Sequence, residues 1–146
     1  MLVLPHVATG AALGALLGDP FVVVPAAVAS HFILDSVPHW QETMAPYIPT
    51  WKTYLRIPID IGLAVTLVIY ALSIHPDLTP GILLGAIFAS APDLDVITIK
   101  LPKLQTGLIK KYWDWHCKIQ REVTSLWGVV TQLVVVVASV VIIRIP

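Results

Sequence analysis

The sequence predicts an all-α, polytopic integral membrane protein, built as one domain of about five membrane segments with a cytoplasmic N-terminus. Of its 146 residues, 57% are hydrophobic and only 12% are charged, against about 25% charged in ordinary soluble proteins. The mean hydropathy is +0.83, and several apolar runs approach the ~20 residues that a membrane-spanning helix needs. The single cysteine, Cys117, excludes an intrachain disulfide.

The first two apolar segments are short. Residues 4–18 are rich in glycine and alanine, which suits close contact between helices in a bilayer. Residues 21–37 form the second segment, which should end there because Pro38 disfavours helix at the residue before it. Since both fall below the ~20 residues of a full span, we expect a tight helical hairpin in a locally thin or protein-lined region.

The remaining segments alternate with two basic connections. Residues 40–53 form a polar connection, and residues 54–74 are apolar and long enough to span. A turn at His75-Pro76-Asp77 leads to a fourth segment, about residues 80–97. Residues 100–121 are basic, aromatic and at least partly helical by pattern, and residues 123–143 form a β-branched run of spanning length. This pattern predicts the five membrane segments.

The charges predict the orientation. The basic residues gather in the second-to-third and fourth-to-fifth connections: Lys52, Arg56, Lys100, Lys103, Lys110, Lys111, Lys118 and Arg121. The opposite side has Arg144 with the acids Asp19 and Asp77. Because cytoplasmic loops carry the excess of Lys and Arg, the N-terminus and both basic connections should be cytoplasmic.

A possible metal-binding motif ends the second segment. His31 and Asp35 are four residues apart, so on a helix their side chains share one face. His39 follows just after Pro38 and should lie in the next turn. The His31/Asp35 pair is therefore expected to form the centre of the site.

Other segments send histidine or aspartate to the same cytoplasmic face. The predicted metal ligands are His6, His31, Asp35, His39, Asp93, Asp95 and His116. Asp60 is predicted as a ligand or catalytic general base, although pairing with Lys52 and Arg56 is the alternative. Asp93 and Asp95 face different ways on a helix, so one should bind metal while the other caps a helix or supports a ligand.

Imidazole and carboxylate ligands favour zinc, with manganese or iron as alternatives. So many candidate ligands suggest one or two ions, and paired ions commonly clamp phosphoryl oxygens. The chain carries no Gly-rich phosphate loop, catalytic-serine elbow or CxxC pair that would indicate another mechanism.

These residues resemble known families. His31-Phe32-Ile33-Leu34-Asp35 followed by Pro38-His39 is similar to the zinc-ligand helix of the zinc-dependent phospholipase C and single-strand nuclease superfamily. Over most of the chain, the residues resemble small bacterial membrane-bound metal-dependent hydrolase-like proteins. The positions that carry this second resemblance are His6-x-x-x-Gly10, Ser30 to Trp40, Pro92-Asp93 and Gly128-x-x-x-Gln132. The resemblance implies hydrolysis of a phosphoester; Cys117 and Gln120 depart from its histidine-rich pattern, which leaves the number of metal ions open.

Together these observations predict a membrane-embedded metal-dependent hydrolase. Its substrate would be a phosphoester or phosphodiester, with a membrane lipid as partner, at the cytoplasmic leaflet. No nucleic-acid partner is expected. The alternatives are a metal or proton transporter, a lipid carrier, or a structural metal site; the oligomeric state stays open.

Overall fold

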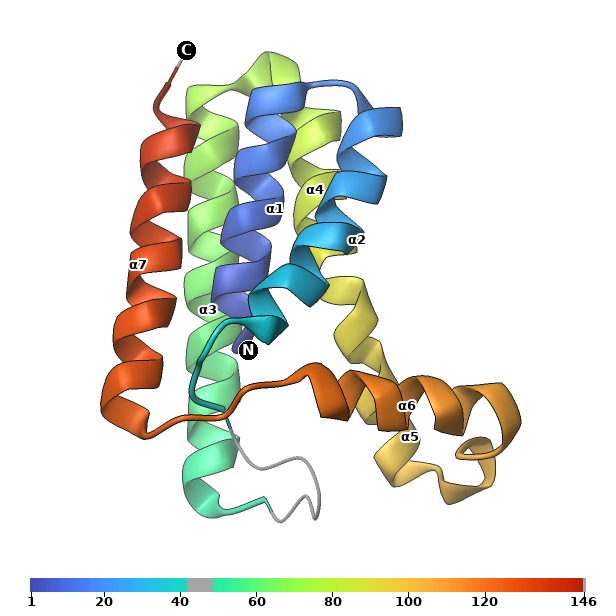
Figure 1. Cartoon of the computed structure of the whole chain (residues 1–146). Helices are drawn as coiled ribbons and strands as arrows, with labels where there is room; N and C mark the ends of the chain where they lie inside the picture. Colours follow the sequence, from blue (N-terminus) through green and yellow to red (C-terminus); the bar gives the residue numbers. More distant parts are fainter. Residues whose placement is uncertain (42–48, 146) are drawn as a thin grey trace.

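The computed structural model describes residues 1–41 and 49–145, without the side chains of residues 99, 100 and 102. Within these ranges all regular elements are helices (Figure 1), and the one strand-like feature is an isolated bridge between His39 and Glu122. The all-α class is thus confirmed.

Two apolar helices form the expected N-terminal hairpin. Helix α1 covers Val3–Leu17 and α2 covers Pro20–Ser36, close to the predicted ranges. Gly18 turns the chain with a φ of 68°, a conformation that suits glycine. The Asp19 side chain then accepts a hydrogen bond from the Phe21 N–H and so caps α2.

The rest of the chain adds two long helices and a set of short ones. Helix α3 covers Trp51–Ile74, and α7 covers Ser125–Ile143. Between them lie η1 (Pro76–Leu78), α4 (Thr79–Ser90), η2 (Ala91–Val96), α5 (Ile97–Lys100), η3 (Pro102–Leu104) and α6 (Gly107–Ile119). The predicted fourth segment is therefore divided: its α-helix ends at Ser90 and a 3₁₀ helix follows, with Pro92 in its first turn.

Helix α1 lies in the middle of the bundle, with α2, α3, α4 and α7 around it (Figure 1). Its closest approach is to α4, where Gly10 meets Gly85 and Gly14 meets Gly81. A Cβ at any of these glycines would run into the backbone of the facing helix. Glycines spaced four apart on both helices thus allow the two backbones to touch.

The prediction of about five membrane segments is wrong by the criterion of length. Among the described residues, two helices, α3 and α7, are long and apolar enough to cross a membrane. Helices α1 and α2 are shorter apolar helices, and α4 has only 12 residues. In α3 and α7 only 17% and 22% of the most apolar window is buried, so these helices do not behave as the core of a soluble protein.

One end of the bundle gathers the chain segments that carry the site. Helix α6 crosses this end, near the N-terminus (Figure 1). The His39 backbone pairs with Arg121 and Val123 in the connection to α7. Helix α7 holds the same region, because Gln132 accepts from the Leu2 N–H and donates to the Trp40 carbonyl. The segment after α2 is thereby fixed between α6 and α7.

Candidate metal centre

Four donor side chains converge at this end of the bundle. His31 and Asp35 come from α2, Asp93 from η2 and His116 from α6, and one ligand atom from each lies within 4.8 Å of all the others. His31, Asp35 and His116 are at most 2% exposed. The predicted pair is therefore joined by two of the other predicted ligands.

The predicted helix geometry brings the first two donors together. His31 and Asp35 project from the same face of α2, and His31 Nε2 lies 3.1 Å from Asp35 Oδ2. His116 Nε2 completes a triangle, at 2.9 Å from the same carboxylate oxygen and 3.2 Å from His31 Nε2. Tetrahedral zinc with ligands at about 2.0–2.1 Å would separate ligand atoms by about 3.3 Å. The three donor atoms, at 2.9–3.2 Å from one another, lie slightly closer than that.

Both histidines have their other ring nitrogen engaged. His31 Nδ1 donates to the Ala89 carbonyl oxygen at 2.8 Å, and His116 Nδ1 donates to Asp95 Oδ2 at 2.6 Å. Such partners fix the ring orientation and direct the Nε2 lone pair towards the metal position. Asp95 thus supports the ligand His116, which is one of the two roles predicted for this pair of aspartates.

Asp93 supplies the fourth donor from the 3₁₀ helix. Its Oδ1 lies 3.6 Å from His31 Nε2 and 4.0 Å from His116 Nε2. Burial raises the pKa of the Asp93 carboxyl above its usual value, because a charged carboxylate is poorly solvated there. A cation among the donors would stabilise that charge.

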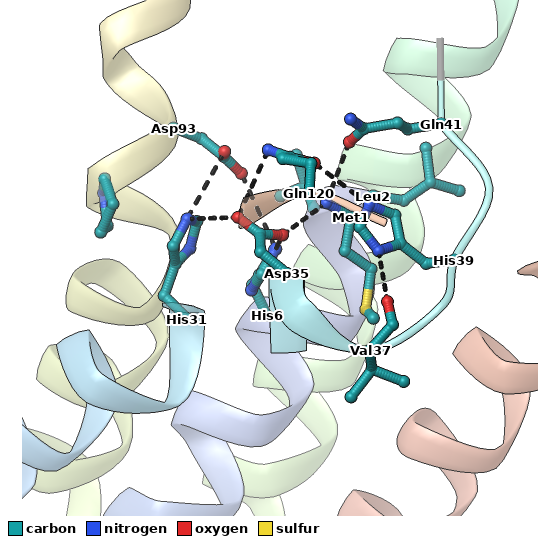
Figure 2. A network of polar contacts seen from close by, with 12 residues as sticks. Met1, Leu2, His6, His31, Asp35, Val37, His39, Gln41, Asp93 and Gln120 are labelled. Carbon is teal, nitrogen blue, oxygen red and sulfur yellow. Dashed lines mark hydrogen bonds and ion pairs between the residues drawn. The ribbon is translucent and has the colours of Figure 1, made fainter. Parts of the chain in front are cut away.

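His6 comes from α1 and lies beside Asp35 (Figure 2), with its ring stacked on that of His31 at 4.1 Å between the ring centroids. Its Nε2 lies 3.2 Å from Asp35 Oδ1 and 3.9 Å from Asp93 Oδ2. Among the described residues neither ring nitrogen of His6 has a hydrogen-bond partner, although the side chain is fully buried. Since orphaned buried polar atoms are costly, His6 fits the role of a ligand. Each carboxylate thus has one oxygen near His31 and His116 and the other near His6, and the Met1 α-ammonium also donates to Asp35 Oδ1 at 2.6 Å (Figure 2).

The electrostatics of the site favour positive charge. Burial alone would lower the pKa of His116, but its hydrogen bonds to the Asp35 and Asp95 carboxylates outweigh burial and raise the pKa to about 9. The same carboxylate field that holds a proton on this ring attracts a divalent cation. The donor set of imidazoles and carboxylates fits zinc, manganese or iron.

The structure places His39 and Asp60 outside the four-donor group. His39 Nδ1 donates to the Val37 carbonyl, and its Nε2 lies 3.1 Å from Gln120 Oε1. Both Asp60 oxygens accept hydrogen bonds from the first turn of α1, at the Val3 and Leu4 N–H groups. The ligand role of His39 and the catalytic or ligand role of Asp60 stay predictions.

Sequence reasoning missed Gln120 as a partner of the site. Its side-chain amide donates to Asp35 Oδ2 at 3.4 Å while its oxygen faces His39, so it links the two. The spacing gave only a partial signal: Gln120 follows His116 by four residues, but α6 ends at Ile119 and Gln120 has an extended backbone. The contact of His31 with the Ala89 carbonyl could not be predicted, because every residue has a backbone carbonyl and the sequence does not show which one is used.

Replacing Asp95 with asparagine should lower metal affinity about 10- to 100-fold without abolishing binding, as expected for a residue that orients a ligand. Titration with Zn²⁺ against a competing chelator measures this change. Asp114→Asn on α6, the helix that carries His116, is the control, because Asp114 is exposed and pairs with Lys110. Equal affinities for the two variants would contradict the supporting role of Asp95.

Comparison of the chain with protein-family models, with curated proteins and with solved structures finds no match.

Proposed function

We propose that the protein is a membrane-embedded, metal-dependent hydrolase of a phosphoester or phosphodiester, acting at the cytoplasmic leaflet of a bacterial inner membrane. The observation that carries the proposal is the arrangement of Asp35 and Asp93. Each has its two oxygens near different histidines, so these residues would offer ligands to two neighbouring cations.

Each part of the donor set has a distinct role in this proposal. His31, His116 and one oxygen from each carboxylate would hold one ion. His6 and the other oxygens would hold a second ion, which at Asp35 Oδ1 would have to replace the Met1 ammonium that now lies 2.6 Å away. Bound metal would supply Lewis acidity and lower the pKa of a bound water. Because these carboxylate and imidazole ligands are largely buried, they would need little reorganisation during the reaction.

A cavity beside the donors gives a substrate room to reach them. It has a volume of about 180 Å³, and Asp93, Gln120, Arg56 and Asp60 are among its lining residues. The Arg56 guanidinium lies over the Trp40 ring at 4.8 Å and shares the cavity wall with the Asp60 carboxylate. A phosphoryl group in this cavity would lie beside the donors, where bound metal would stabilise its negative charge.

The membrane placement rests on α3 and α7. Both have mostly exposed apolar surfaces, and such surfaces are stable only when covered. Helices α1, α2 and α4 then lie beside these two spans within the same membrane. The basic residues of α6 and the start of α3 lie at the end that carries the site, which supports a cytoplasmic N-terminus.

Purified protein in detergent micelles tests the proposal. We expect it to hydrolyse members of a panel of phosphomonoesters and phosphodiesters, including phosphatidic acid and bis(p-nitrophenyl) phosphate. Removing metal with a chelator should abolish turnover, and adding back Zn²⁺ or Mn²⁺ should restore it. His31→Ala should reduce turnover at least 100-fold, whereas His75→Ala, at the opposite end of the bundle, should not.

A protein that binds metal in stoichiometric amounts but hydrolyses none of these esters would contradict the proposal. That result would favour the alternative of a transporter or lipid carrier with a structural metal site. A metal content far below one ion per chain would exclude both interpretations of the cluster.

A further inference from the structure

Helix α6 is amphipathic, and the bundle covers only one of its sides. That inward side carries Trp113 and His116, which are buried. Beside it runs an apolar stripe, formed by residues at the spacing of one helix face: Leu108, Tyr112, Trp115 and Ile119. The next side around the helix is charged and carries Lys111, Asp114 and Lys118. The proposed metal chemistry uses only the inward side.

The apolar stripe is largely uncovered. Leu108 is 82% exposed and Trp115 is 46% exposed. The Trp115 ring packs against the ring of Phe32 on α2, with 5.1 Å between the ring centroids. Ile33, the next residue of α2, is itself 64% exposed. The apolar stripe of α6 therefore adjoins the apolar outer surface of α2.

The direction of α6 suits a helix that lies along a membrane surface. Figure 1 shows α6 crossing the direction of α3 and α7, the two helices that are long and apolar enough to span a membrane. If α3 and α7 cross the bilayer, α6 lies close to the membrane plane. A helix with leucine and tryptophan on one side and lysine on the other is typical of the boundary between headgroups and acyl chains.

The charged side of α6 indicates which lipids it would favour. The helix contains three lysines and one aspartate. Lys110 pairs with Asp114, whereas Lys111 and Lys118 are exposed and form no ion pair within the part of the chain that the structure describes. A lysine at the membrane surface raises the affinity for anionic lipid by about fivefold. The charged side thus complements anionic headgroups.

We propose that α6 lies in the headgroup region of the cytoplasmic leaflet, with its apolar stripe against acyl chains and with Lys111 and Lys118 bound to anionic phospholipid. The inference rests on the membrane placement in the proposed function and not on the hydrolase chemistry. Because α6 carries His116, the lipid surface would help to hold a ligand-bearing helix in place.

Fluorescent labels on two sides of α6 test this placement. The full-length protein, with Cys117→Ser, carries the dye NBD at either Leu108→Cys or Asp114→Cys, both exposed positions, and is placed in phosphatidylcholine nanodiscs. Quenching by phosphatidylcholine with a doxyl group on its acyl chain reports contact with the acyl chains. It should be at least threefold stronger for the label at position 108. Equal quenching at the two positions would overturn the placement of α6.

The headgroup preference is measured with the label at position 108 and two quenchers that differ only in headgroup. Doxyl-labelled phosphatidylglycerol should quench more strongly than doxyl-labelled phosphatidylcholine at the same mole fraction, and about 1 M salt should reduce this difference. Replacing both Lys111 and Lys118 with glutamine should remove most of the preference, whereas replacing both with arginine should retain it. Equal quenching by the two lipids, or an unchanged preference in the glutamine variant, would overturn the role of the lysines.

These readouts require no turnover. If the labels behave as expected but no ester is hydrolysed, the assignment of α6 stands and the proposed hydrolase function fails. A protein that does not enter nanodiscs would contradict the membrane placement of α3 and α7, and the inference about α6 with it.

Discussion

Replacing Asp35 with asparagine is expected to abolish metal binding, with a loss of affinity of more than about 100-fold. Asp35 is the central residue of the site: Oδ2 lies within 3.1 Å of both His31 Nε2 and His116 Nε2, and Oδ1 lies 3.2 Å from His6 Nε2. An amide removes the negative charge that attracts the cation, and its nitrogen cannot act as a metal ligand. The loss should therefore exceed that expected for Asp95→Asn, which affects a supporting residue.

Metal content after desalting, measured by mass spectrometry, gives the result directly. Asp77→Asn is the control, because Asp77 is exposed in the turn at the opposite end of the bundle. Thermal unfolding in the presence of a chelator shows whether the Asp35 variant remains folded. A folded Asp35→Asn protein that retains one metal ion per chain would exclude this site as the metal centre.

Replacing Gly85 with alanine is expected to destabilise the protein by about 3 kcal/mol, the upper range for overpacking. A Cβ at Gly85 would overlap the carbonyl of Gly10 and come within 3.2 Å of Val23 Cγ1. Backbone atoms cannot rotate away as side chains do, so α1 and α4 would have to separate. Because α1 carries His6 and α4 leads into Asp93, we also expect weaker metal binding.

Gly62→Ala provides a control with the opposite sign. Gly62 lies within α3, and an added Cβ there would meet nothing within 4 Å. Alanine forms helix better than glycine, so this variant should be stabilised by about 0.5–1 kcal/mol. Thermal unfolding in detergent measures both changes, and a Gly85→Ala protein as stable as the wild type would contradict the close α1–α4 packing.

The sequence predicted those parts of the site that depend on helical spacing. His31 and Asp35 share a face at a separation of four residues, and this geometry needs no tertiary information. The roles of Asp93 and Asp95 could not be separated in the same way. Their chain segment is a 3₁₀ helix after Ser90, and Asp95 gains its role only because α6 brings His116 to it.

The hydrogen-bond partners of Asp60 could not be predicted from the sequence. An aspartate near the start of an apolar span is a candidate for chemistry, but here its oxygens accept N–H groups from the first turn of another helix. Backbone partners leave no trace in the side-chain pattern. The predicted number of membrane spans was wrong for a related reason. Hydropathy reports the length of an apolar run, but it does not show that α4 ends at Ser90, where the 3₁₀ helix η2 follows.

The bridge between the segment after α2 and the connection before α7 also bears on the order of biosynthesis. Residues up to Asp93 supply His31, Asp35 and their neighbour His6, whereas His116 and the Arg121–Val123 partners of His39 are translated later. A nascent chain therefore has an open, three-sided half-site until α6 is added. The four-donor group is therefore complete only after residue 116 has been translated.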